Sequence, residues 1–159
     1  MDHKNLIVVG VDGSAGSRRA LRWALREAVE SDADVDAVTV WTWDGLEDAM
    51  LAATAPSAQR EHADRVSADE VQTAVDECGE PVRVSRTVVE GHPVQELIGA
   101  ARHGRLLVLG SHGHGRLHRA VLGSISTECA RRAPCPVVIV PADEAGRVTD
   151  SQPATAVSV

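Results

Sequence analysis

The chain has 159 residues, a formal net charge of −7 at pH 7 and 43% hydrophobic residues, with neither Phe nor Tyr. This length suits one domain with an aliphatic core, and the acidic balance argues against nonspecific nucleic-acid binding, which depends on neutralising phosphates. No apolar run approaches membrane-spanning length, and no signal peptide or even set of cysteines is visible, so we expect a cytoplasmic protein with reduced thiols and no membrane partner.

Strand-like and helix-like segments alternate from the start of the chain. A continuous apolar run at 6–11 predicts a parallel strand covered on both faces. After Asp12, apolar residues recur at helical spacing as far as Val29, and residues 35–41 predict a second strand. The arginines of this first helix are predicted to form a solvated face: Arg18, Arg19, Arg22 and Arg26.

The middle of the chain is more polar. Residues 44–57 have no clear period and predict a mobile loop, whereas 58–77 predict a polar helix that Gly79 ends. The residues that we expect this helix to bury are Ala63, Val66, Val71 and Val75.

The last segments complete an alternating series. They are a third strand at 82–89, a short helix at 94–101, a fourth strand at 106–109, a helix at 124–133 and a fifth strand from Pro136 to Pro141. The small polar residues 143–159 predict a disordered tail after a single domain at 1–142.

This alternation predicts an α/β fold: a single doubly wound five-stranded parallel sheet, strand order 3-2-1-4-5, with helices on both faces. In that order the winding reverses between strands 1 and 4, and ligands of open α/β sheets bind at the carboxyl ends of such strands. The turns at 10–13 and 110–113, nearly a hundred residues apart, should therefore meet in space.

The segment 106–126, LLVLGSHGHGRLHRAVLGSIS, has the chemistry of an anion site. A strand, a glycine-rich turn and a Gly-Ser helix start direct backbone N–H groups and the positive end of a helix dipole to one place. We expect glycine here because a side chain would block a phosphate and would forbid positive φ angles. Residues 101–136 contain six arginines and one acid, a local +5 that leaves −12 on the rest of the chain.

Three stretches carry a family resemblance: VVGVDGSAGSRRALRWALREA, VVEGHPVQELI and LVLGSHGHGRLHRAVLGSISTECARRAPCPVVIVP. Together they make the chain similar to a universal stress protein over about residues 4–141. The motif of that family's nucleotide-binding branch, G-x2-G-x9-G-[ST], is matched by Gly110, Gly113, Gly123 and Ser124. The resemblance implies the doubly wound sheet, ATP with Mg²⁺ at the switch point, and a homodimer.

The resemblance also assigns residues to parts of the nucleotide. Asp12 resembles the acid that contacts adenosine, with Gly10 beside it, and Val40 resembles the residue that meets adenine through its backbone. The four motif residues would surround the phosphates. The wall of that loop would comprise Ser111, His112, Gly113, His114, Gly115 and Arg116. Two departures bear on affinity and its pH dependence: histidines at 112 and 114 where arginine or another polar residue is common, and Arg105 where an acid is usual.

Each feature has a simpler interpretation. The glycines could be ordinary turn residues, and Asp12 could only cap the following helix. The pattern H-x-H-x3-H, formed by His112, His114 and His118, could bind zinc or nickel, although we favour loop residues or phosphate donors. Cys129 and Cys135 are expected to be inert thiols.

Two function classes remain after other nucleotide motifs are excluded. The chain has no G-x4-G-K-[ST], and its first glycines depart from the dinucleotide fingerprint. We favour an ATP-binding stress-response or signalling module; the alternative is an adenine-nucleotide α-hydrolase-type enzyme that cleaves ATP. No clear general base is visible, so any hydrolysis should be slow or partner-dependent. The apolar edge strand, Val137 to Val140, predicts a homodimer.

Overall fold

The computed structural model describes residues 5–42, 56–112 and 122–141. The described strands are β1 (Leu6–Gly10), β2 (Asp34–Trp41), β3 (Val84–Glu90), β4 (Leu106–Gly110) and β5 (Val137–Val140). The described helices are α1 (Ala15–Ser31), α3 (Pro56–Cys78), α4 (Pro93–Ala101) and α5 (Ser124–Arg132). In this part of the chain, no helix is both long and apolar enough to cross a membrane.

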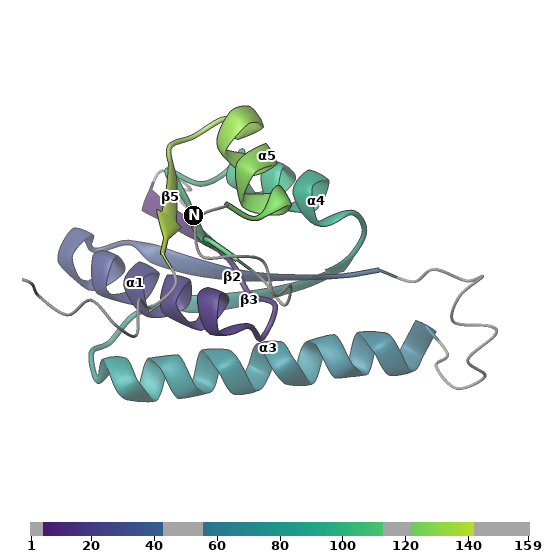
Figure 1. Cartoon of the computed structure of the whole chain (residues 1–159). Coiled ribbons are helices and arrows are strands. Elements are labelled where there is room, and N and C mark those ends of the chain that lie inside the picture. Colours follow the sequence, from purple (N-terminus) through teal and green to yellow (C-terminus); the bar gives the residue numbers. More distant parts are fainter. Residues whose placement is uncertain (1–4, 43–55, 113–121, 142–159) are drawn as a thin grey trace, which may run out of the picture.

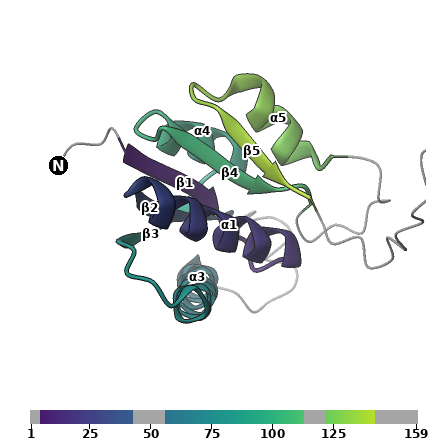
Figure 2. The same cartoon turned by 90° about the vertical axis from the view of Figure 1, so that its left-hand side faces the viewer.

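The strands form one parallel sheet in the order β3-β2-β1-β4-β5, which confirms the predicted topology. Helices α1 and α3 lie on one face, and α4 and α5 lie on the other (Figure 1), as the turned view also shows (Figure 2). Val9 pairs with Ala37 on one side and with Val108 on the other, so the carboxyl ends of β1, β2 and β4 lie close together.

The core consists of two aliphatic layers, one on each face of the sheet. Ile7 and Val9 of β1 pack with Leu21 and Leu25 of α1, whereas Val8 belongs to the layer under α4. This division follows from the strand period of two, which sends successive side chains to opposite faces. A central parallel strand must therefore be apolar at every position, as the run at 6–11 predicts.

Several predicted boundaries shift by one or two residues. Helix α3 begins at Pro56, so Pro56 and Ser57 are helical and do not belong to the predicted loop. Proline suits a first helical turn because the N–H that it lacks has no intrahelical partner there. Strand β1 ends at Gly10 and β3 begins at Val84, slightly inside the predicted ranges. The rest of the predicted loop and the predicted tail at 143–159 lie outside the described residues.

The prediction of the buried face of α3 is half wrong. Ala63 and Val71 are buried as expected, but Ser67 and Ala74 are buried as well, whereas Val66 and Val75 are only half-buried. Positions 63, 67, 71 and 74 form one helical stripe with steps of four, four and three. The prediction followed residue type instead of this spacing, so it missed a serine that faces the sheet.

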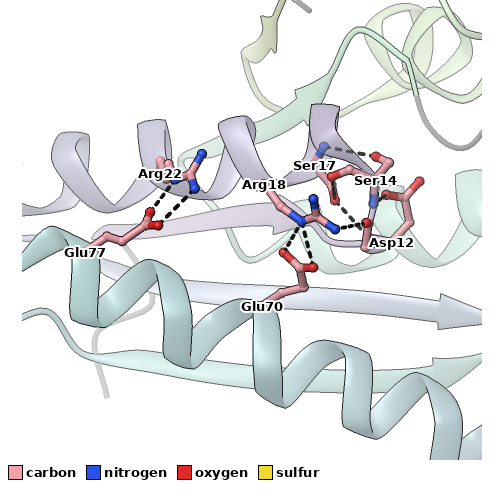
Figure 3. Close-up of polar contacts among 8 residues, drawn as sticks. Asp12, Ser14, Ser17, Arg18, Arg22, Glu70 and Glu77 are labelled. Atoms are coloured by element: carbon pink, nitrogen blue, oxygen red, sulfur yellow. Dashed lines mark hydrogen bonds and ion pairs between the residues drawn. The ribbon is translucent and has the colours of Figure 1, made fainter.

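Two arginines of the predicted solvated face on α1 stay partly exposed but also form ion pairs. The Arg18 guanidinium lies 2.8 Å from a carboxylate oxygen of Glu70, and Arg22 lies 2.5 Å from one of Glu77. Both partners belong to α3, which packs alongside α1 (Figure 3). The sequence could not indicate these pairs because their members are 52 and 55 residues apart.

The buried hydroxyl of Ser67 allows a test of this packing. Ser67 is 0% exposed, and among the described residues its Oγ has no hydrogen-bond partner. Because an unpaired buried polar group is costly, Ser67→Ala should raise the free energy of unfolding by up to about 1 kcal/mol. Val71→Ala, one turn further along the same stripe, should lower it by about 2 kcal/mol. Urea denaturation measures both; a loss of stability in Ser67→Ala would contradict the proposed cost.

Candidate functional site

A pocket of about 120 Å³ opens at the carboxyl ends of β1 and β4, where the winding of the sheet reverses. Its walls come from both strands, from the turns after them, from β2 and from three helices. The lining residues are Gly10, Val11, Asp12, Ser14, Ser17, Val38, Val40, Pro93, Leu97, Leu109, Gly110, His112, Ile125 and Ser126. The two turns that the sequence predicted to converge therefore do meet.

The turn after β1 is held by hydrogen bonds within residues 12–17. The Ser14 N–H donates to Asp12 Oδ1 at 2.9 Å, and the Ser17 N–H donates to Ser14 Oγ at 3.1 Å (Figure 3). Ser14 is thus the N-cap of α1, and Asp12 instead accepts from the cap residue's own N–H. Because Asp12 is exposed at the pocket wall, its carboxylate is presented to the pocket as well as to the turn.

The turn after β4 is fastened to two neighbouring elements. The Ser111 N–H donates to the carbonyl of Val140 in β5 at 2.9 Å, and the Ser111 carbonyl accepts from the Gly123 N–H at 2.8 Å. The Ser126 hydroxyl donates to the Gly110 carbonyl at 2.7 Å. These bonds place the start of α5 against the pocket, where its first N–H groups have no intrahelical partner.

His112 supplies a polar atom that no described residue uses. Its Nδ1 lies 3.0 Å from Ser111 Oγ, whereas its Nε2 is buried and has no hydrogen-bond partner in the described part of the chain. If the serine hydroxyl donates to Nδ1, the imidazole carries its proton on Nε2. The Nε2–H is then a donor at a pocket whose other polar groups are hydroxyls and one carboxylate.

Glycines at 16 and 110 allow the two turns to touch through their backbones. A Cβ built on Gly110 would lie 2.6 Å from the carbonyl carbon of Gly16, and one built on Gly16 would overlap the carbonyl oxygen of His112. Real side chains do not approach backbone atoms so closely. The first turn of α1 can therefore sit against the end of β4 only because both positions lack a side chain.

At two positions of the motif, Gly110 and Gly123, the expected positive φ angle is absent. Among the described glycines, positive φ angles occur at Gly13, Gly79 and Gly91, and neither Gly110 nor Gly123 has one. Gly110 is required by its neighbour Gly16, and a Cβ on Gly123 would lie 3.1 Å from the Ser111 carbonyl oxygen. The spacing of the motif thus reflects close packing of the loop on the sheet at these two positions.

The structure brings together part of the predicted site. Five predicted residues line the pocket: Gly10, Asp12, Val40, Gly110 and His112. Ser111 and Gly123 lie directly behind it through their mutual hydrogen bond, and Ser124 is exposed at the start of α5. Four predicted residues lie outside the described ranges: Gly113, His114, Gly115 and Arg116.

The residues that the sequence analysis missed are mostly apolar and form one wall of the pocket. They include Val38, Leu97, Leu109 and Ile125, together with Pro93 and the hydroxyl residues Ser14, Ser17 and Ser126. The sequence could have indicated Val38, because residues two apart in a strand lie on the same face and Val40 was already predicted to be in the site. The sequence could not have indicated Leu97, because it reaches the pocket only through the packing of α4 on β1 and β2.

Among the described residues of 101–136, two arginines form ion pairs away from the pocket. Arg105 lies 2.9 Å from a Glu27 carboxylate oxygen on α1, and Arg132 lies 3.3 Å from one of Glu128. No arginine from the described ranges is among the lining residues. Of the arginines in this segment, Arg105 is paired with a residue far away in the chain and Arg132 with one a turn before it, whereas Arg116 and Arg119 lie outside the described residues.

The thiols and the histidine pattern offer no alternative chemistry in the described part of the chain. Cys129 is fully buried, and burial raises the pKa of its thiol to about 11; burial also raises the pKa of Cys135. Both stay protonated at pH 7, as the prediction of inert thiols requires. Among the described residues no three His, Cys, Asp or Glu side chains could hold a metal, and His114 and His118 lie outside them.

The fold and the pocket define a doubly wound α/β domain with a ligand crevice at its switch point. A comparison with known families identifies it further: the model of the universal stress protein family matches residues 5–141. The chain belongs to the universal stress protein family.

Curated relatives agree with this assignment. A universal stress protein of Mycolicibacterium smegmatis is 36% identical over 146 residues, covering 87% of this chain and 48% of that protein. One of Mycobacterium tuberculosis is 32% identical over 139 residues, covering 84% of this chain and 47% of that protein. The chain thus spans about half the length of the curated relatives that it matches.

Solved structures share the fold over almost their whole length. A universal stress protein family member from Burkholderia pseudomallei is 28% identical with a TM-score of 0.63, covering 89% of this chain and 99% of that one. A universal stress protein in complex with cAMP is 24% identical with a TM-score of 0.66, covering 86% and 96%. One from Archaeoglobus fulgidus in complex with dAMP is 20% identical with a TM-score of 0.61, covering 87% and 98%.

The backbone contact between the two turns predicts that alanine will have opposite effects on the free energy of unfolding at two glycines. Gly16→Ala should lower the free energy of unfolding by at least about 2 kcal/mol, because the new methyl group overlaps the His112 carbonyl. Gly99→Ala, at an exposed position of α4 with open space around it, should raise it by about 0.5–1 kcal/mol. Thermal or urea denaturation compares them; equal stabilities would contradict the role of Gly16.

Proposed function

We propose that the chain binds an adenine nucleotide, ATP with Mg²⁺, in the switch-point pocket and acts as a nucleotide-dependent stress-response or signalling module. The observation that carries this proposal is the pairing, in one crevice, of an apolar wall with converging polar groups. Family members with the same fold are described as complexes with cAMP and with dAMP, which supports an adenine nucleotide as the ligand class.

The apolar wall suits a base. Val38 and Val40 of β2, Leu97 of α4 and Leu109 of β4 line the pocket and pack in one hydrophobic cluster. Flat apolar surroundings of this kind accept a purine ring, and backbone groups at a strand end can read its edge. The described pocket, about 120 Å³, is smaller than typical sites for a complete ligand of this size. We assign it to the adenosine part.

The polar side suits the sugar and the phosphates. Asp12 provides a carboxylate acceptor for adenosine hydroxyls, and the Nε2 of His112, which no described residue uses, provides a donor for an anion. The start of α5, at Gly123 and Ser124, adds N–H groups with a favourable dipole. Residues Gly113 to Arg116 complete the proposed phosphate loop. Asp12 is the one carboxylate among the described lining residues, so Mg²⁺ would be held mainly by the phosphates.

A binding role fits the site better than hydrolysis. The titratable side chains among the described lining residues are Asp12 and His112. Asp12 already accepts a hydrogen bond from the Ser14 N–H, and the Nδ1 of His112 lies within hydrogen-bond distance of Ser111 Oγ. Unchanged ATP after long incubation supports the module, whereas AMP and pyrophosphate would support the α-hydrolase alternative.

The Asp12 carboxylate provides the direct test of the site. Asp12→Asn keeps an oxygen for the Ser14 N–H, so the turn should survive, but a neutral acceptor makes weaker hydrogen bonds to adenosine hydroxyls. We expect the Kd for ATP to rise about tenfold, which corresponds to about 1.4 kcal/mol, in isothermal titration calorimetry.

A matched control separates this effect from a change in net charge. Asp69→Asn removes the same charge from an exposed position on α3 and should leave the Kd for ATP unchanged. If Asp12→Asn binds AMP, ADP and ATP as the parent does, Asp12 is not part of the site.

We also propose a homodimer formed through the edge of the sheet. β5 pairs with β4 on one side, and no described strand lies on its other side. Its four residues, Val137 to Val140, are apolar and only half-buried. An exposed apolar edge of this kind pairs with another chain unless it is covered. Pro136 and Pro141 bracket the strand and would restrict antiparallel pairing to a short register.

Ile139 allows a test of the dimer that spares the core. Val138 and Val140 pack against the layer under α1 and Val137 against the layer under α4, whereas Ile139 belongs to neither set. Sedimentation should give about twice 16.8 kDa for the parent, and Ile139→Asp should shift it towards monomer. Val29→Asp, at an exposed apolar position of α1, serves as the control. A parent that is monomeric at high micromolar concentration would refute the interface.

A further inference from the structure

We propose that Arg18 is a positioning residue for the nucleotide site, which it serves by fixing where the Asp12 turn sits relative to α3. This inference rests on the proposed function, since it concerns how the adenosine contact at Asp12 is oriented. Arg18 itself does not line the pocket, and it belongs to the helix face that the sequence predicted to be solvated.

The Arg18 guanidinium joins the turn to α3 with two sets of hydrogen bonds. Its Nε donates to both carboxylate oxygens of Glu70, at 2.8 and 2.9 Å, and one terminal nitrogen donates to the carbonyl of Gly13 at 2.9 Å (Figure 3). Gly13 directly follows Asp12. The backbone of the turn is thus tied to a carboxylate on a helix 52 residues later in the sequence.

This link differs from the hydrogen bonds inside the turn. The bonds from Ser14 to Asp12 and from Ser17 to Ser14 fix the internal shape of residues 12–17. They do not relate that segment to α3, which lies beside α1 and carries Glu70. Arg18 supplies a direct hydrogen-bonded link between the turn and α3, so its loss should leave the internal shape of the turn intact but hold Gly13 less firmly relative to α3.

The chemistry of the Arg18–Glu70 pair favours one fixed arrangement of its hydrogen bonds. The Glu70 side chain is 16% exposed, so its carboxylate is largely shielded from water by the two helices. The guanidinium is planar and directs its N–H groups at set angles, so anchoring Nε on Glu70 also aims the terminal nitrogen at Gly13. A lysine ammonium would keep the charge opposite Glu70 but would not hold two acceptors in one plane.

A second ion pair between the same helices provides a matched control. Arg22 donates to Glu77 at 2.5 and 3.1 Å, and this hydrogen bond raises the pKa of Arg22 and lowers that of Glu77. Arg22 lies one turn further along α1, and its guanidinium is directed to Glu77 instead of residues 12–14 (Figure 3). It therefore contributes to the packing of α1 on α3 without reaching the site.

The experiment is a double-mutant cycle on the full chain, with ATP affinity measured by calorimetry. Arg18→Ala should raise the Kd for ATP about fivefold, as expected for the loss of one ordered hydrogen bond, and Arg22→Ala should leave it unchanged. Because Arg18 acts through the turn, adding Arg18→Ala to Asp12→Asn should weaken binding no further than Asp12→Asn alone. Purely structural damage would instead add to the loss.

A conservative variant covers the case in which Arg18→Ala folds poorly. Arg18→Lys should keep the melting temperature of the parent and still weaken ATP binding about threefold, because the second acceptor is lost. Parental affinity in both Arg18 variants, an equal loss in Arg22→Ala, or additive losses in the cycle would each overturn the positioning role while leaving ATP binding intact. A parent that binds no adenine nucleotide would refute the proposed function and this role together.

Discussion

The site depends on one backbone contact, between the first turn of α1 and the turn that follows β4. A Cβ on Gly110 would lie 2.6 Å from the Gly16 carbonyl carbon, and one on Gly16 would overlap the His112 carbonyl oxygen. β1 and β4 pair directly in the sheet, and this contact allows the turns that follow them to pack against each other. Asp12 from one turn and His112 from the other both line the crevice at this point.

The two turns are also tied to elements away from the pocket. Ser111 is hydrogen-bonded to Val140 in the edge strand, Gly110 is hydrogen-bonded to Ser126 in α5, and Gly13 is hydrogen-bonded to Arg18 and through it to α3. A ligand that moved either turn would therefore disturb the sheet edge or a helix. This arrangement suits a protein whose output is a change of conformation or partner, because binding energy reaches surfaces that other chains can contact.

The chemistry of the pocket agrees with such an output. Its wall is aliphatic, in keeping with a core that has no Phe or Tyr, and several of its polar groups also hold the turns: Asp12, Ser14, Ser17 and Ser126. Buried, protonated thiols add no nucleophile to it. The curated relatives are about twice as long as this chain, so the fold that it represents also occurs within larger proteins.

The sequence by itself determined the order of the elements, the sheet topology and the meeting of the turns after β1 and β4. These follow from local signals: apolar runs, helical spacing and breaks at glycine, combined with the chirality rule for parallel strands. Tertiary structure alone decided that Ser67 faces the sheet, that Leu97 lines the pocket and that Arg18 reaches both Glu70 and Gly13. Such contacts join residues far apart in the chain. A local sequence pattern cannot indicate them, because it does not determine which side chains of two distant segments will meet.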